Sequence, residues 1–354
     1  MSDSKKNIRI VDIARLAGVS AGTVDRVLHD RGKVSPEKKE KIEKVLKEIN
    51  YTPNIIARSL AMKKHYTIVV FIPVFGKGSY WDTLDSGIKK AASELANFNI
   101  GIEYVYYDQY NGDSFKKKVT EILEMDIDAV LIAPLFDAHS AWLSRQLDEK
   151  EIPYVYVDSN IEGQNNLAYF GANSFDSGRL AAKLLIYEIG LDSDIMIVRI
   201  PSVTADESNQ TLAREKGFLE YLKDKDYSGR IHKIELSYDA AKTKSRISDI
   251  VNRHGIRGGI MFNSRIYELS SVLSDALTER VKLIGYDLIE KNIQALREGK
   301  VSFLLSQRSD MQGYNGVKSL SNYLLFKKLP EKINYMPIDI IVKENIDYYN
   351  NNSL

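Results

Sequence analysis

Cysteine is absent from the 354 residues, which excludes disulfides and thiolate metal sites. The five histidines are scattered and form no HxH or HxxxH pair, so we expect no metal site: His29, His65, His139, His232 and His254. No apolar run reaches the roughly 18 residues that a membrane span needs. The polar, charged N-terminus does not resemble a signal peptide. These absences predict a cytoplasmic protein with no membrane partner.

Charge is distributed unevenly along the chain, although the net charge is only +1. Residues 1–64 contain 15 Lys and Arg against 8 Asp and Glu, whereas the remaining residues contain 34 against 40. A basic head on an acidic body is typical of a nucleic-acid-binding head. The length predicts two or three folded units.

The basic head contains a helix-turn-helix pattern in residues 10–32, IVDIARLAGVSAGTVDRVLHDRG. We expect a short helix from Val11 to Ala17, and then Gly18 where a side chain would be costly in a sharp turn. Ser20 is a good N-cap for a second helix that runs to about Leu28. A third helix is expected to start at Ser35-Pro36. The second helix of such a motif enters the major groove of DNA.

The outward residues of the second helix are Ala21, Gly22, Asp25, Arg26 and His29, and all of them except Asp25, whose carboxylate would face phosphate, are candidate DNA contacts. Arg26 is the side chain that can make a bidentate contact with guanine. Ser20 and Thr23 are placed to contact phosphates, which position the helix without specifying sequence. Residues 18–22 also match the GxSxG nucleophile elbow, but that elbow requires a preceding strand, and here a helix precedes. We therefore treat the match as a coincidence.

Residues 51–61, YTPNIIARSLA, follow the head. With DIARLAGVS in the first motif, this segment resembles the LacI/GalR family of transcription regulators. The resemblance implies a hinge helix that folds on operator DNA and enters the minor groove through Asn54, Ala57 and Leu60, with Leu60 as the wedge between base pairs. Asp25 departs from the serine that the family more often has. The implied domains are a headpiece at 7–52, a hinge at 53–64 and an effector-binding domain at 65–346.

The remaining chain alternates apolar strands with amphipathic helices in two similar series. Strands are expected at 67–74, 100–107, 129–135 and 154–158, and after a helix near 174 at 194–200, 231–236, 258–263, 281–287 and 302–307. The fold class is therefore multidomain, an all-α headpiece plus an α/β domain of two doubly wound parallel-sheet lobes. It resembles the type I periplasmic sugar-binding fold. Crossings are expected near 159–168, 288–308 and 328–336, giving one lobe of about 66–163 plus 308–331 and another of about 164–307 plus 332–346.

Ligands of such sheets bind beyond the carboxyl ends of the strands. By the resemblance, the aromatic pair Tyr80 and Trp81 stacks on a sugar ring, and Arg214 donates to sugar oxygens. The other candidate ligand residues end expected strands: Asp158, Asn263, Asp287 and Gln307. Each alone has a simpler explanation as a cap, a turn residue or a core aromatic. Ser159-Asn160 depart from the arginine or asparagine that often follows the family's aspartate.

Two other functions compete with a regulator. A dinucleotide-dependent α/β enzyme is suggested by Gly76-Lys77-Gly78, but Trp81 stands where the third glycine of the motif belongs. A solute-binding protein without a regulatory role would require a signal peptide. No catalytic constellation emerges, so we expect no enzyme activity and no cofactor. The sequence favours a homodimeric, effector-controlled repressor or activator on a pseudo-palindromic operator, and leaves open whether the effector releases or recruits it.

Overall fold

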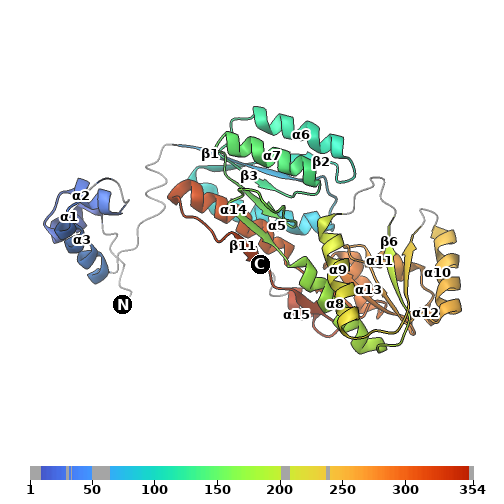
Figure 1. Cartoon of the computed structure of the whole chain (residues 1–354). Helices are drawn as coiled ribbons and strands as arrows, with labels where there is room; N and C mark the ends of the chain where they lie inside the picture. The colour runs from blue at the N-terminus through green and yellow to red at the C-terminus, as the bar shows by residue number, and fades with distance from the viewer. Residues whose placement is uncertain are drawn as a thin grey trace. The chain divides into compact units, whose positions relative to one another are not determined.

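The computed structural model describes residues 9–28, 32, 34–49, 64–200, 208–236 and 240–350. The chain divides into two compact units, Met1–Met62 and Lys63–Leu354 (Figure 1). Four of the expected DNA-contacting residues lie outside the described residues: His29, Asn54, Ala57 and Leu60.

The first unit contains three helices, α1 (Ile10–Ala17), α2 (Ala21–Leu28) and α3 (Pro36–Glu48). Their shared core consists of five buried residues: Ile13, Ala14, Ala17, Val24 and Ile42. Gly18 ends α1 with φ 63° and ψ 35°, the left-handed conformation that an L side chain disfavours. The residue types of the motif therefore produce the expected turn between α1 and α2.

The second unit contains two six-stranded sheets. The first has the order β11-β5-β4-β3-β1-β2, with every neighbouring pair parallel. Its strands are β1 (Tyr66–Pro73), β2 (Ile100–Tyr107), β3 (Ala129–Ile132), β4 (Tyr154–Val157), β5 (Ala168–Gly171) and β11 (Ile333–Tyr335). Most of β1 is buried, as expected for a continuous apolar run in a central strand.

The second sheet has the order β12-β10-β9-β8-β6-β7. Its strands are β6 (Ile195–Arg199), β7 (Ile231–Glu235), β8 (Gly258–Ile260), β9 (Lys282–Tyr286), β10 (Phe303–Ser306) and β12 (Asp339–Ile341). The outer strand β12 runs antiparallel to β10, and the other pairs are parallel. The expected class of two parallel-sheet α/β lobes is confirmed, with one antiparallel edge strand added.

Helices cover both faces of each sheet, with an apolar core under each face. The first sheet packs α5 (Tyr80–Leu95) and α14 (Ser309–Phe326) on one face, and α6 (Gly112–Glu124) and α7 (Asp137–Glu149) on the other (Figure 1). The second sheet packs α8 (Ser174–Ile189) and α9 (Asn209–Asp224) on one face. Its other face carries α10 (Ala240–His254), α11 (Ile266–Val272), α12 (Asp275–Thr278), α13 (Glu290–Arg297) and α15 (Ile346–Asn350). The 3-10 helix η1 (Ala96–Phe98) follows α5.

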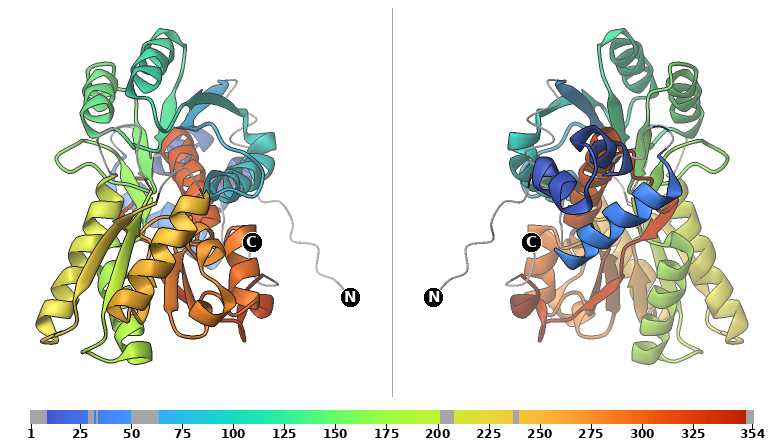
Figure 2. Two further views of the ribbon diagram at one scale, coloured as in Figure 1. Left: turned by 90° about the vertical axis from the view of Figure 1, so that its right-hand side faces the viewer. Right: turned by 90° about the vertical axis from the view of Figure 1, so that its left-hand side faces the viewer.

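The chain passes between the lobes three times: after β5, after β10, and between β11 and β12. Figure 2 shows the two lobes of this unit, with α9 and α10 in the lobe coloured yellow to orange. The expected lobe boundaries at 163 and 331 were wrong by several residues, because β5 and β11 pair with the first sheet. The first crossing therefore follows Gly171, just after the expected 159–168, and the third lies at 336–338, at the end of the expected 328–336.

Among the described residues, none of the helices is long and apolar enough to cross a lipid bilayer.

Candidate functional site

The exposed side of α2 is the candidate DNA-contacting surface. Ala21, Gly22 and Arg26 are exposed there, while Val24 is fully buried and fixes the helix on α1 and α3. Ser20 caps α2, since its Oγ accepts from the backbone N–H of Thr23 at 3.2 Å and lies 2.8 Å from Thr23 Oγ1. The motif thus presents two hydroxyls at the start of α2 and one guanidinium in its last turn.

All seven residues expected to bind ligand line one cavity of about 530 Å3 between the two lobes: Tyr80, Trp81, Asp158, Arg214, Asn263, Asp287 and Gln307. The volume lies within the usual range for small-molecule sites. Tyr80 and Trp81 come from the first turn of α5 and Arg214 from α9, and the other four follow the ends of β4, β8, β9 and β10. The carboxyl ends of both sheets therefore face the same cavity.

Asp158 and Asp287 occupy equivalent places in the two lobes. Both have left-handed backbones, with φ 67° and 69°, a conformation that a short polar side chain tolerates. Burial raises the pKa of the Asp158 carboxyl, although the Tyr80 hydroxyl and the charge of Arg214 oppose this. Burial also raises the pKa of Asp287 to about 6, against the charge of Arg214 and a hydrogen bond from Gln307.

The two carboxylates differ in how many donors they already have. Oδ1 of Asp158 accepts from Tyr80 and from Gln210, and Oδ2 accepts from Ser159. Within the described part of the chain, the Asp287 carboxylate has one hydrogen bond, from Gln307 Nε2 to Oδ1 at 3.0 Å. Asp287 thus keeps capacity to accept a ligand hydroxyl, whereas Asp158 is largely occupied by protein donors.

Arg214 is 1% exposed and presents a guanidinium to the cavity. Its Nη1 donates to the Phe262 carbonyl at 2.8 Å, and its Cζ lies 4.1 Å from the centre of the Tyr286 ring. Among the described residues, Nε and Nη2 have no hydrogen-bond partner. Buried donors of this kind are costly unless they are paired, so the site is suited to a ligand oxygen at this point.

Tyr80 and Trp81 pack edge to face, with ring centres 5.0 Å apart. Both are at least nine-tenths buried, and the indole N–H of Trp81 donates to Gln109 Oε1 at 3.3 Å. The apolar wall that they form suits the C–H face of a sugar ring. Asn263 lies in the turn beyond β8, where its Oδ1 accepts from the backbone of Arg265 at 3.0 Å.

Sequence reasoning missed several residues that line the cavity, chiefly Gln109, Arg199, Gln210 and Arg265. Arg199 pairs with Glu215, and Arg265 pairs with Glu268 through Nε at 2.7 Å. Two of the four could have been sought as strand-end residues, since Arg199 ends β6 and Gln109 follows β2. Gln210 had no such signal, because it stands in the first turn of a helix.

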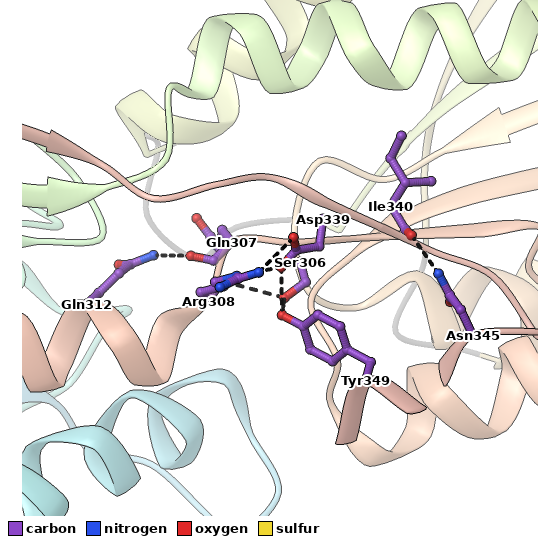
Figure 3. A network of polar contacts seen from close by, with 8 residues as sticks. All are labelled: Ser306, Gln307, Arg308, Gln312, Asp339, Ile340, Asn345 and Tyr349. Atoms are coloured by element: carbon purple, nitrogen blue, oxygen red, sulfur yellow. Dashed lines mark hydrogen bonds and ion pairs between the residues drawn. The ribbon is translucent and has the colours of Figure 1, made fainter. Parts of the chain in front are cut away.

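A polar network joins two of the three inter-lobe connections (Figure 3). Arg308, between β10 and α14, donates to both carboxylate oxygens of Asp339, at 2.7 and 3.1 Å. Tyr349 of α15 donates to the same carboxylate at 2.8 Å, and its hydroxyl lies 3.1 Å from Ser306 Oγ. The connections after β10 and before β12 are therefore tied to each other and to α15.

The chain matches two protein-family models. Residues 9–54 match the lacI family of bacterial regulatory proteins, and residues 68–328 match the periplasmic binding protein domain. The first match covers the helix-turn-helix, and the second covers both lobes. Together they favour a regulator over the enzyme and solute-binding alternatives.

Individual proteins agree with the family models. The ribose operon repressor of Lactococcus lactis is 26% identical over 290 residues, 79% of this chain and 81% of that protein. The structure of a putative LacI transcriptional regulator from Bacteroides fragilis has a TM-score of 0.76 at 36% identity, covering 81% of this chain and 100% of that one. A glucose-galactose binding protein from Geobacillus stearothermophilus has a TM-score of 0.69 at 21% identity, covering 80% and 99%, which shows a shared fold. The chain belongs to the LacI family of DNA-binding bacterial transcription regulators.

Proposed function

We propose that the cavity between the lobes binds a neutral polyhydroxy effector, a monosaccharide or a derivative of one, which controls the affinity of the protein for its operator. The observation that carries this proposal is the buried Arg214, which lines a cavity with an aromatic wall and whose Nε and Nη2 have no hydrogen-bond partner among the described residues. Asp287 and Asn263 supply acceptors, and Gln307 links Asp287 to the connection after β10. The name of the ribose operon repressor agrees with this effector class.

The proposed coupling uses the two lobes as a hinge. An effector that contacts both strand-end clusters favours the closed arrangement of the lobes. Closure acts on the connections that Arg308, Asp339 and Tyr349 tie together. The effector changes operator affinity only to the extent that it binds the two arrangements differently.

On DNA, we propose that residues 7–52 form the headpiece, 53–64 the hinge and 65–346 the effector domain, in a cytoplasmic protein. Arg26 would contact bases, while Ser20 and Thr23 at the start of α2 contact phosphates and Ala21 and Gly22 lie on the same DNA-facing side. His29 would extend that contact. Asn54, Ala57 and Leu60 would act in the minor groove, with Leu60 as the wedge.

A homodimer would supply the paired heads that a pseudo-palindromic operator requires. The outer strand β2 offers one surface for it, since the rings of Tyr104 and Tyr106 stack there at 5.5 Å and Tyr106 is 38% exposed. Sedimentation velocity of the full chain tests this, and Tyr106→Lys should shift the protein toward the monomer. A monomer at micromolar concentration without the substitution would contradict the proposal.

A thermal-shift screen of the full chain against monosaccharides, sugar acids and sugar phosphates tests the effector. An effector at 100 times its Kd stabilises the native state by about 2.7 kcal/mol. That corresponds to a rise in Tm of roughly 4 °C for a protein of this size. A flat response across the neutral sugars, with a shift only for another class, would contradict a neutral polyhydroxy effector.

A further inference from the structure

Five side chains form a continuous hydrogen-bonded chain across the cavity. Tyr80 donates to Asp158 Oδ1, and Gln210 Nε2 donates to the same oxygen at 3.0 Å. The Gln210 amide also lies 3.3 Å from Gln307 Oε1, and Gln307 Nε2 donates to Asp287 Oδ1 at 3.0 Å. Four of these residues are the proposed effector contacts, and Gln210 is the link between the two halves.

Gln210 belongs to the second lobe and reaches into the first. It lies in the first turn of α9, whose Phe218 and Leu222 are buried in the core of the second lobe. Its amide also donates to the backbone carbonyl of Asp158, which follows β4 of the first sheet, at 3.2 Å. The preceding Asn209 donates to Asp137 of α7. The first turn of α9 is therefore a direct contact between the lobes.

The Gln210 amide occupies acceptors that an effector would use. Its –NH2 group has two N–H donors on one atom, which the Asp158 carboxylate, the Asp158 carbonyl and the Gln307 amide oxygen share as acceptors. Two neighbouring hydroxyls of a polyhydroxy compound offer two O–H donors with the same partners. An effector can bind Asp158 and Gln307 in this way only by displacing Gln210.

We propose that Gln210 is a latch that holds the two lobes together and competes with the effector for Asp158 and Gln307. This inference rests on the effector role proposed for the cavity. Gln210 then determines specificity, because a compound must replace the hydrogen bonds that Gln210 makes to Asp158 and Gln307 and so take over the contact between the lobes. Compounds that lack one of the two hydroxyls do not gain enough to displace it.

Distances between spin labels on the two lobes test the latch without any effector. The chain has no cysteine, so Lys117→Cys on α6 and Lys223→Cys on α9, both exposed, give a unique labelled pair. Gln210→Ala removes the bridge. Gln210→Glu keeps its size and faces the Asp158 carboxylate with a second negative charge, while an acidic residue in the first turn still suits α9. Both variants should shift the distance distribution to longer and broader values, Gln210→Glu more strongly.

Gln294→Ala is the matched control, because Gln294 is exposed on α13 and bonds Glu298 of its own helix at 2.8 Å. It should leave the distances unchanged. Identical distributions for the native residue and both Gln210 variants would overturn the latch, whatever the cavity binds. Longer distances together with a flat sugar screen would instead refute the proposed effector and leave the latch standing.

Competition between Gln210 and the effector is tested by measuring effector affinity. A sugar that stabilises the native protein should bind Gln210→Ala about tenfold more tightly, the equivalent of one net hydrogen bond. Equal or weaker affinity for the variant would overturn the competitive role, and a weaker affinity would indicate instead that Gln210 contacts the effector directly.

Discussion

Replacing the buried Arg214 by methionine should separate effector binding from folding stability. Within the described part of the chain, the guanidinium makes one hydrogen bond, to the Phe262 carbonyl, and lies on the Tyr286 ring. A hydrogen bond from a charged group contributes about 1.5–3 kcal/mol, and a desolvated cation–π contact about 2 kcal/mol. Methionine loses both, but it also removes a buried charge whose desolvation costs several kcal/mol. We therefore expect the free energy of unfolding to change by no more than about 2 kcal/mol.

The effect on the effector should be much larger. The Nε and Nη2 donors that have no partner among the described residues would each give an effector oxygen a charge-assisted hydrogen bond. Two such bonds at about 1.5–3 kcal/mol each correspond to an affinity loss of more than about 100-fold. Isothermal titration calorimetry with the compound that gives the largest thermal shift measures this loss, and urea unfolding measures stability.

Arg179→Met is the matched control. Arg179 lies on α8 of the same lobe, contacts the Tyr221 ring at 5.4 Å and pairs with Asp224 at 2.8 Å, away from the cavity. It should leave effector affinity unchanged. An affinity for Arg214→Met within tenfold of the native value would refute the role that we assign to the unpaired donors.

Three further outcomes follow from the structure and the sequence. Trp81→Ala should abolish the effector response while operator binding, measured by fluorescence anisotropy, persists; a surviving response would contradict the stacking role. Asp287 has a pKa of about 6 in the folded protein and a lower one in the unfolded chain, so its contribution to stability should fall as the pH rises from about 4 to 6. Effector affinity should instead fall as the pH drops below 6, because the protonated carboxyl is a poorer acceptor for a ligand hydroxyl. Asp287→Asn should flatten both pH profiles, the affinity measured by calorimetry and the stability by urea unfolding. Leu60→Ala should weaken specific operator binding in gel-shift assays, and an unchanged affinity would rule out the wedge.

The sequence predicted the order of the major elements and the composition of the cavity wall. Asp158, Asp287 and Gln307 could be found because parallel strands place their carboxyl ends at one edge of each sheet. Tyr80, Trp81 and Arg214 came instead from resemblance to a family, since neither an aromatic pair in a first helical turn nor an arginine within a helix marks a site by itself. In the structure all seven candidate ligand residues line the cavity. Their contact with an effector stays a prediction.

Three strands were missed, β5, β11 and β12, and each has only three or four residues. A run that short has no readable alternation, and its position depends on pairing with a partner distant in sequence. Ile333–Tyr335 pairs with Tyr169–Gly171, for example. The role of Gln210 could not be predicted for the same reason. It depends on hydrogen bonds to Asp158 and Gln307, which are both distant from Gln210 in sequence.

The position of the last strands has a consequence for synthesis of the protein. The three helices of the first unit are complete at Glu48, whereas the outer strands of both sheets, β11 and β12, begin only at Ile333 and Asp339. During translation the part that reads DNA can therefore fold long before the part that senses the effector is finished. A chain that stops shortly before residue 333 would keep its helix-turn-helix but lack an edge strand of each sheet and the Asp339–Tyr349 bond. Late truncations should consequently behave as unregulated or rapidly degraded proteins, rather than as regulators with a weakened response.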